Sequence, residues 1–321
     1  MSLYQTEFSK ESNKLPSLLD FTRITHRRKL MDPKEGEYTL YRLEMGELGE
    51  QTVLDFIEKY GNKDWFVFRN VWMDYYGSYE SDIILITKHA IYVFEVKNYD
   101  GAFEYEDGQC RINGNIYGSN CVFQAERALI NLQNICREIS PSVPVKGALI
   151  FIGEHNQVTI HSKVNNIQII MRNQLRNYIR QIAKDEAMST TTPINVQKII
   201  KKFEELEIIN PYGPKAFQPS DLTKAKKGIC CARCGSFSLE ISKLFVRCSC
   251  GFQELRKEAM LRTIYEYGAL IFETDEMRTS DLEIFLNKQA SRGYLLNILK
   301  ENFQRINFGK STAFQNKKIL Y

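Results

Sequence analysis

No stretch of this 321-residue chain approaches the apolar run, roughly 18 or more residues, that a helix needs to cross a bilayer. The opening segment, MSLYQTEFSKESNKLPSL, is polar and lacks the apolar centre of a secretory signal. No internal repeat or low-complexity tract is present, and a composition of 43% hydrophobic and 26% charged residues is typical of globular proteins. We therefore expect a soluble, cytoplasmic protein with no membrane partner.

Histidine is scarce, with four residues, whereas five of the eight cysteines crowd into 21 positions. Without a secretion signal we expect no disulfide framework, and such crowding indicates a metal site. A C-x2-C pair and a C-x-C pair, each followed by glycine, resemble zinc knuckles and are formed by Cys231, Cys234, Cys248 and Cys250. Four thiolates close a tetrahedral structural zinc site, and no nearby histidine suggests an open, catalytic one. Cys230 is an alternative to Cys231 as a ligand.

Changes in composition divide the chain into five segments. Residues 1–41 are polar and poorly periodic and should form a loosely packed N-terminal arm. Residues 42–209 form the main domain, and residues 210–228, with three prolines and several lysines, are the expected linker. The cysteines place a zinc ribbon at 229–254, and 255–321 should be a small helical, basic module.

Charge is uneven along the chain, although the net charge is only +4. Residues 215–321 hold 18 Lys and Arg against 11 Asp and Glu, whereas residues 1–214 hold 25 against 28. A basic tail suits a polyanionic partner, and uneven surface charge without a partner explains it as well. Near its end, basic and aromatic residues alternate: Lys300, Phe303, Arg305, Phe308, Lys310, Phe314, Lys317 and Lys318. The tail could be a winged-helix-like nucleic-acid module, or the aromatics could simply be its core.

Within the main domain, hydrophobic patterns predict a helix at 46–61, strands at 65–73, 81–87, 90–99 and 145–153, a hairpin at 103–118, and helices at 121–139 and 193–206. The strand AIYVFEVKNY is apolar on both faces until Glu95 and Lys97 appear on one of them. A central strand, buried on both sides, fits this pattern.

The preceding strand can bring a second carboxylate to Glu95. If Lys88 and His89 form a two-residue hairpin loop, Asp82 faces Glu95 and Glu80 faces Lys97. Two facing carboxylates in an apolar setting call for a cation, and oxygen ligands suit Mg²⁺, Mn²⁺ or Ca²⁺. Lys97 could orient or deprotonate an attacking water, or offset the charge of a phosphate. The alternative is a salt bridge at the end of a strand.

Two flanking helices add polar residues to this region. Glu47 and Glu50 lie on the same stripe of helix 46–61 as Leu54 and Ile57, which the helix dipole alone does not explain. Gln124 borders the apolar stripe of helix 121–139 and could reach the carboxylates from another side, although taken alone it fits a capping or surface role better.

The segments GELGE, YESDIILITKHAIYVFEVKNYDG and NCVFQAERAL resemble, in this order, the nuclease-related domain (NERD), which is similar to the PD-(D/E)XK nucleases. The resemblance covers roughly residues 42–155. It implies an α/β fold, a mixed sheet flanked by helices as in restriction endonucleases. Asp82, Glu95 and Lys97 match the metal-binding and catalytic triad, and Glu50 and Gln124 match the helical glutamate and the glutamine. One departure is Ile83, where the family usually has a polar residue.

The resemblance implies Mg²⁺- or Mn²⁺-dependent hydrolysis of a phosphodiester in nucleic acid, with DNA as the expected substrate. It also allows a homodimer, since many nucleases of this fold act in pairs. A fold does not by itself establish an activity. The alternatives are a non-catalytic nucleic-acid-binding scaffold and a protein-interaction module.

Overall fold

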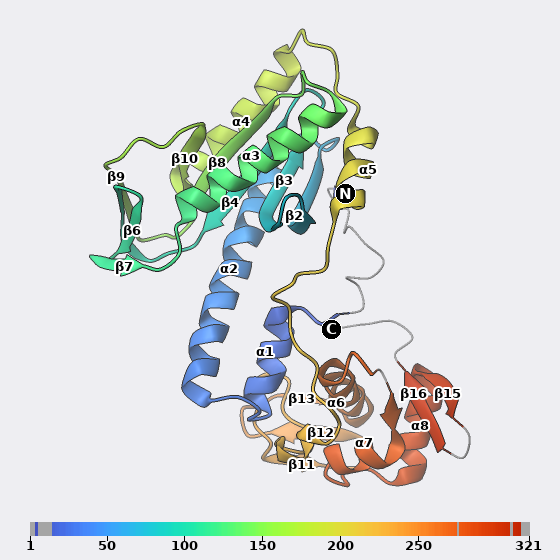
Figure 1. Cartoon of the computed structure of the whole chain (residues 1–321). Coiled ribbons are helices and arrows are strands. Elements are labelled where there is room, and N and C mark those ends of the chain that lie inside the picture. Colours follow the sequence, from blue (N-terminus) through green and yellow to red (C-terminus); the bar gives the residue numbers. More distant parts are fainter. Residues whose placement is uncertain (1–3, 6–14, 275, 309–310, 316–321) are drawn as a thin grey trace. The chain divides into compact units, whose positions relative to one another are not determined.

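The computed structural model describes residues 4–5, 15–274, 276–308 and 311–315, and they divide into two compact units (Figure 1). The first unit is Glu44–Pro211 with the short strand β1 (Tyr4–Gln5). The second unit holds the described residues of Lys10–Leu43 and of Tyr212–Tyr321. None of the described helices is both long and apolar enough to cross a membrane.

A mixed six-stranded sheet, in the order β1-β2-β3-β4-β8-β10, is the centre of the first unit. Its remaining strands form a small second sheet, β7-β6-β5-β9. The elements are α2 (Pro33–Tyr60, in this unit from Glu44), β2 (Phe66–Asp74), β3 (Ser78–Ile86), β4 (Ile91–Lys97), β5 (Gly101–Glu106), β6 (Gln109–Ile112), β7 (Asn115–Tyr117), α3 (Cys121–Ile139), β8 (Val145–Phe151), β9 (Asn156–Ile160), β10 (Ile167–Met171), α4 (Arg172–Met188) and α5 (Val196–Leu206). The predicted α/β fold, a mixed sheet flanked by helices, is confirmed.

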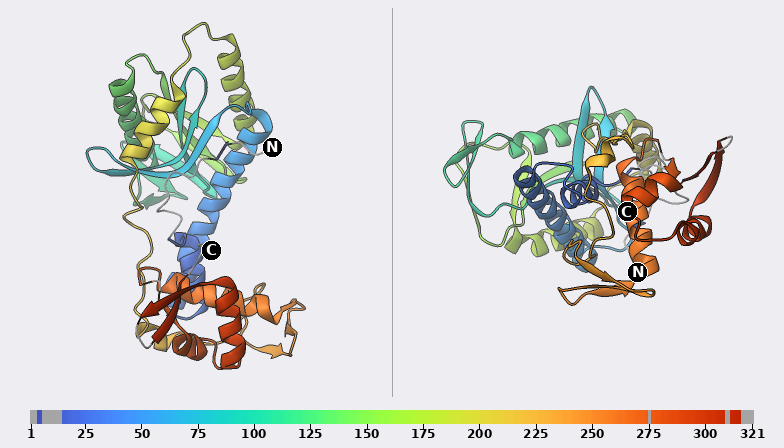
Figure 2. Two further views of the ribbon diagram at one scale, coloured as in Figure 1. Left: turned by 90° about the vertical axis from the view of Figure 1, so that its right-hand side faces the viewer. Right: turned by 90° about the horizontal axis from the view of Figure 1, so that it is seen from below.

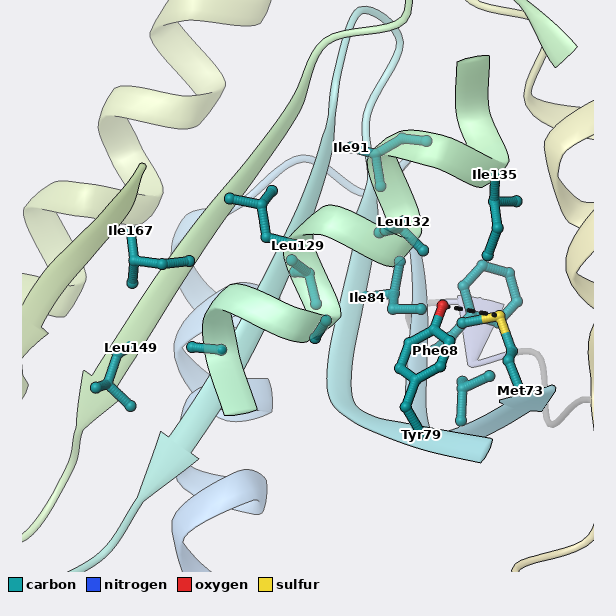
Figure 3. Packing of buried hydrophobic residues seen from close by; sticks show 14 of the residues in the cluster. Phe68, Met73, Tyr79, Ile84, Ile91, Leu129, Leu132, Ile135, Leu149 and Ile167 are labelled. Atoms are coloured by element: carbon teal, nitrogen blue, oxygen red, sulfur yellow. Dashed lines mark hydrogen bonds between the residues drawn. The ribbon is translucent and has the colours of Figure 1, made fainter. Parts of the chain in front are cut away.

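Helices cover both faces of the large sheet, which explains why its central strands are apolar on both sides. α3 and α5 pack on one face, where Leu129 and Leu132 contact Ile84 and its neighbours in one core (Figure 3). α2 and α4 pack on the other face, in a second core that includes Leu54 and Ile179. Figure 2 shows this layering in two further views.

The β3–β4 hairpin has the register that the sequence predicts. Ile86 pairs with Ile91 and Ile83 with Phe94, and the Thr87 N–H donates to the Ala90 carbonyl across the turn. β4 also pairs in parallel with β8, so that it lies inside the sheet, as predicted. The register therefore brings Asp82 towards the carboxyl end of β4.

The sheet is locally distorted at Asp82. Neither the β2–β3 ladder nor the β3–β4 ladder includes Asp82, and Asn70, which would lie opposite it in β2, has a φ of 52°. Phe68 and Val71, three residues apart, pack in the same core, although strict alternation would place them on opposite faces. The alternation of β2 side chains between the two faces of the sheet is therefore interrupted here, and the Asp82 backbone takes no part in the regular ladders.

The second unit joins an N-terminal helix to the C-terminal third of the chain. Its elements are α1 (Leu18–Arg27), the first part of α2, a 3₁₀ turn (Asp221–Lys224), β11 (Leu239–Ile241), β12 (Phe245–Cys248), β13 (Gln253–Leu255), α6 (Arg256–Leu270), β14 (Met277–Arg278), α7 (Thr279–Phe285), α8 (Arg292–Asn302), β15 (Gln304–Phe308) and β16 (Ser311–Gln315). The expectation of a loosely packed arm is wrong for 18–27. Phe21 and Ile24 are buried in one core with Ile264 of α6, and this apolar contact orders the helix.

The C-terminal module contains strands that the sequence did not predict. β14, β16 and β15 form an antiparallel sheet beside the helices α6, α7 and α8, and these helices agree with the predicted helical character of the module. Phe303 and Phe314 are buried in the core, in accordance with the structural interpretation of the aromatics. The side chain of Phe308, together with Lys310, Lys317 and Lys318, lies outside the part of the chain whose side chains are described.

Candidate functional site

Charged side chains meet where β3 and β4 part, at the carboxyl end of β4. Glu95 is only 6% exposed, and its Oε1 accepts a hydrogen bond from Lys97 Nζ at 2.7 Å. The Asp82 Oδ2 accepts a hydrogen bond from the Val96 backbone N–H, also at 2.7 Å. A side chain thus replaces the ladder bond that regular pairing would supply, and it holds the Asp82 carboxylate beside Glu95.

Glu80 adds a third carboxylate from β3. Its Oε1 accepts a hydrogen bond from Trp72 Nε1 at 3.0 Å. The sequence predicts Glu80 opposite Lys97. The regular β3–β4 ladder ends before this pair, but Lys97 is close enough for its charge to oppose the rise in the pKa of Glu80. Burial, and then the charge of Asp82, raise the pKa of Glu80 to about 7.

α2 contributes Glu50, and β2 contributes a residue that sequence reasoning missed. Arg69 donates from Nε to Glu50 Oε2 at 2.7 Å and from Nη1 to Glu47 Oε1 at 3.0 Å. Burial lowers the pKa of Arg69, but the two glutamates raise it, and the net shift is upward. Arg69 therefore fixes Glu50 by a charged hydrogen bond. Its position in the apolar strand WFVFRNVWM was the signal that could have revealed it.

A glycine allows α2 to pass close to the end of β4. A Cβ at Gly49 would lie 2.9 Å from Asn98 Cβ and 3.2 Å from Ile152 Cγ2. Asn98 Nδ2 also donates to the Met45 carbonyl at 2.8 Å. The close approach of the backbone explains Gly49 in the GELGE segment, and it positions the adjacent Glu50.

Gln124 lies in the first turn of α3, at the margin of this group. Its Oε1 is buried and has no hydrogen-bond partner in the described part of the chain. Cys121, which begins the same helix, is close enough for the charges of Lys97 and Glu95 to act on its thiol. No hydrogen bond among the described residues joins Gln124 to Asp82 or Glu95, so the structure does not bring it into the group as the sequence suggested.

The carboxylates of this group, one buried and three half-buried, repel one another and resist ionisation. Burial, and then Asp82, raise the pKa of Glu95 to about 8. Burial and Asp82 also raise the pKa of Glu50 to about 7 against the opposing effect of Arg69, and burial raises the pKa of Asp82. Burial lowers the pKa of Lys97, whereas Glu95 and Asp82 raise it, with a net upward shift. Asp82 and Glu95, whose charges act on each other at the end of β4, offer carboxylate oxygens, which suit a hard divalent cation.

A second cluster lies in the second unit, at the predicted zinc ribbon. Four Sγ atoms lie within 4.8 Å of one another, those of Cys231, Cys234, Cys248 and Cys250. They are carried by the turns that flank β11 and β12, an antiparallel hairpin as predicted. Four thiols at this spacing are compatible with a tetrahedral metal site.

Cys230 does not join the four thiols. It is buried, and its Sγ lies 3.6 Å from Arg27 Nη1 and 3.5 Å from Arg262 Nη1. Both arginines also pair with Glu266 of α6. Cys230 thus faces a charged cluster that links α1 to α6, which leaves Cys231 as the member of the metal-type group.

A comparison with protein families matches residues 45–152 to the model described as the nuclease-related domain (NERD). Neither the curated proteins nor the solved structures gave a match. The matched segment begins within α2 and ends directly after β8, so that it includes Glu50, Asp82, Glu95 and Lys97. Residues 45–152 therefore form a nuclease-related domain, and the carboxylates of Glu50, Glu80, Asp82 and Glu95 lie inside it.

Proposed function

We propose that this protein is a metal-dependent phosphodiesterase that cuts nucleic acid, with DNA as its expected substrate. The observation that supports this most is the meeting of Asp82, Glu95 and Lys97 at the end of β4, inside a nuclease-related domain. A salt bridge at a strand end would need only Glu95 and Lys97. It would not require two further half-buried acids, Asp82 and Glu80, whose pKa values are raised by desolvation.

The donor set fits Mg²⁺ or Mn²⁺, because it offers carboxylate oxygens and neither thiol nor imidazole. Asp82 and Glu95 would hold the cation. When bound, it would promote attack by water and neutralise charge on the phosphate. Desolvation and repulsion by Asp82 raise the pKa values of Glu50, Glu80 and Glu95. A bound cation would offset this repulsion and favour the ionised carboxylates.

The chain's own residues would orient the substrate. Lys97, held at 2.7 Å by Glu95, presents an ammonium group that can hydrogen-bond to a phosphate oxygen or to the attacking water. Glu50, fixed by Arg69, limits the site on the α2 side, and Gln124 offers an unpaired Oε1 on the α3 side. Fixed donors and acceptors of this kind reduce the reorganisation that the reaction requires.

We further propose that the four thiols of the ribbon bind a structural Zn²⁺. The hairpin has little core of its own, since Val246 is the one residue of β11–β13 that is buried. A metal would therefore supply much of its stability. The ribbon, together with the rest of the basic segment 215–321, would help to bind the nucleic acid through its phosphates.

The test is a cleavage assay on labelled single-stranded and duplex DNA and RNA, with Mg²⁺, with Mn²⁺ and with no added divalent cation. Metal-dependent cutting of at least one substrate is expected, and of DNA in particular. If the folded protein with its zinc bound cuts none of them, the protein is a binding scaffold or an interaction module instead. Its mass in solution, measured on the same preparation, tests the expected homodimer.

A further inference from the structure

We infer that the exposed side of α4, together with the groove between α4 and α2, binds the sugar-phosphate backbone of the nucleic acid. This inference rests on the proposed function, which it deepens by naming where the substrate lies. Four basic residues recur every fourth position along α4: Arg172, Arg176, Arg180 and Lys184. We call them the α4 ridge.

The spacing of the ridge suits a chain of phosphates. Positions four apart are neighbours on a helix, about 6 Å apart along its axis, so the ridge extends over about 18 Å. A nucleic-acid strand carries one charge per about 3.4 Å of its axis, so about five phosphates fit along that length. Arg176, Arg180 and Lys184 are exposed. Arg172 pairs with Glu154 at 3.3 Å, whereas no ion pair is found for the other three in the described part of the chain.

The two acidic residues of α4 do not neutralise the ridge. Glu186 accepts hydrogen bonds from Trp65 Nε1 and from the Lys88 backbone N–H, so its carboxylate is directed to the body of the unit. Asp185 accepts a hydrogen bond from Gln181, one turn before it. Both acids lie in the last turn of the helix, beyond Lys184. The exposed charge before them is uniformly positive.

A groove of about 570 Å³ lies along the start of the ridge. Phe56 and Tyr60 of α2 line one wall, and Arg172 and Arg176 of α4 line the other. Asn156 also lines it, and its Nδ2 is buried without a hydrogen-bond partner among the described residues. Glu154 lines the groove too and pairs with Arg172 at 3.3 Å, so Arg176 and the unused amide donor are the groups left to hold an anionic oxygen.

The groove and the proposed catalytic residues lie at the same edge of the large sheet, where β4 and β8 end. Gly153, part of its lining, comes two residues after Phe151, and Phe151 is the β8 partner of Lys97. On α2, Phe56 lies six residues beyond Glu50, about 9 Å along the helix. Lys97 alternates with Val96 of the α2–α4 core, so its side chain leaves β4 on the other face. A strand cut at Lys97 would therefore pass around the carboxyl edge of the sheet to reach the groove.

The chemistry favours a nucleic acid over a lipid surface. The ring of Tyr60 lies under Arg180, 5.1 Å from its Cζ, and beside Lys59. An aromatic ring among cations suits a chain that alternates bases with phosphates. No exposed apolar residue occurs on the ridge between Arg176 and Lys184 that could insert into a membrane.

The test compares two triple variants of the full-length protein. The ridge variant carries Arg176→Gln, Arg180→Gln and Lys184→Gln, and leaves Arg172, which hydrogen-bonds to the Ile152 carbonyl, intact. The control variant removes the same charges from α3 and α5, on the opposite face of the sheet. It carries Arg127→Gln, Arg137→Gln and Lys201→Gln, all exposed. Binding to fluorescent DNA is measured by anisotropy at several salt concentrations, with no divalent cation added.

The ridge variant should bind at least about tenfold more weakly, and the slope of log affinity against log salt should fall by about three for duplex DNA. The control should remain within about twofold of the wild type. Equal binding by both variants would overturn the inference, as would wild-type protein that binds no nucleic acid. The inference would also be overturned if the ridge variant bound DNA as the wild type does but lost binding to phosphatidylserine vesicles. This assay measures binding and not cleavage. If the ridge variant loses binding but the wild type cuts no nucleic acid, the inference stands and only the proposed reaction is refuted.

Discussion

Single charged residues inside apolar strands carry most of the functional information in this chain. Glu95 and Lys97 interrupt β4, and Arg69 interrupts β2 in the same manner. Each is held by a partner of opposite charge, because a buried charge is costly without one. The same reasoning that identified Glu95 and Lys97 would have identified Arg69, had the α2 carboxylates been considered as its partners.

Removing Arg69 should leave Glu50 buried without its cation. We expect Arg69→Met to lower the free energy of unfolding by about 1–3 kcal/mol in urea denaturation. The double variant with Glu50→Leu should lose less than the sum of the two single losses, since the pair is removed together. Unchanged stability in Arg69→Met would contradict the positioning role.

The identity of the fourth metal ligand is also decided by one residue. Cys231→Ala should abolish stoichiometric zinc, whereas Cys230→Ala should retain it, because Cys230 contacts Arg27 and Arg262 instead of the other thiols. Zinc content of the purified proteins by mass spectrometry decides between them. Retention by Cys231→Ala with loss in Cys230→Ala would reverse the assignment.

At the scale of elements, α2 is the helix that brings the carboxylate of Glu50 to the sheet. Its residues Gly46 and Gly49 are both in the GELGE segment, but only Gly49 lies against other atoms. Helix propensity favours alanine over glycine at either position by about 1 kcal/mol. The close contact of Gly49 with Asn98 and Ile152 should reverse that preference.

Gly46→Ala, which meets nothing within 4 Å, should therefore raise the melting temperature. Gly49→Ala should lower it, because its Cβ would be forced against Asn98 Cβ at 2.9 Å. Differential scanning calorimetry of the two variants gives the comparison. A rise in both would show that α2 does not approach the end of β4 so closely.

The sequence predicted the elements of the first unit well, and the reason is local. The two-residue turn after Thr87 and the apolar pattern of β3 and β4 fix their register, because a slip by one residue would turn every buried side chain outward. The break at Asn70 and Asp82 could not be predicted, since strict alternation was assumed there. α1 was missed because its partners in α6 lie more than 200 positions away.

At the scale of the whole molecule, the chain returns to its N-terminal segment to complete the second unit. Arg28, fully buried, pairs with Glu266 of α6 and donates to the Gly228 carbonyl. A buried pair of this kind is costly to break because the remaining charge has no partner. This pair therefore holds two distant parts of the sequence in one unit.

Glu266→Gln should lower the free energy of unfolding by about 3–5 kcal/mol. Its control is Glu301→Gln, which removes an exposed ion pair with Lys257 and should cost less than about 1 kcal/mol. Denaturant unfolding followed by fluorescence measures both. Equal losses would mean that the buried cluster does not stabilise the unit.

The most direct measurement is metal-dependent cleavage by Glu95→Gln beside the wild type. The control is Glu58→Gln, an exposed glutamate on α2 two turns after Glu50. With Mg²⁺ or Mn²⁺ and the substrate that the wild type cuts, Glu95→Gln should lose cleavage by at least about 100-fold, and the control should match the wild type. Full cleavage by a folded Glu95→Gln protein would show that the reaction, if any, takes place away from the group formed by Asp82, Glu95 and Lys97.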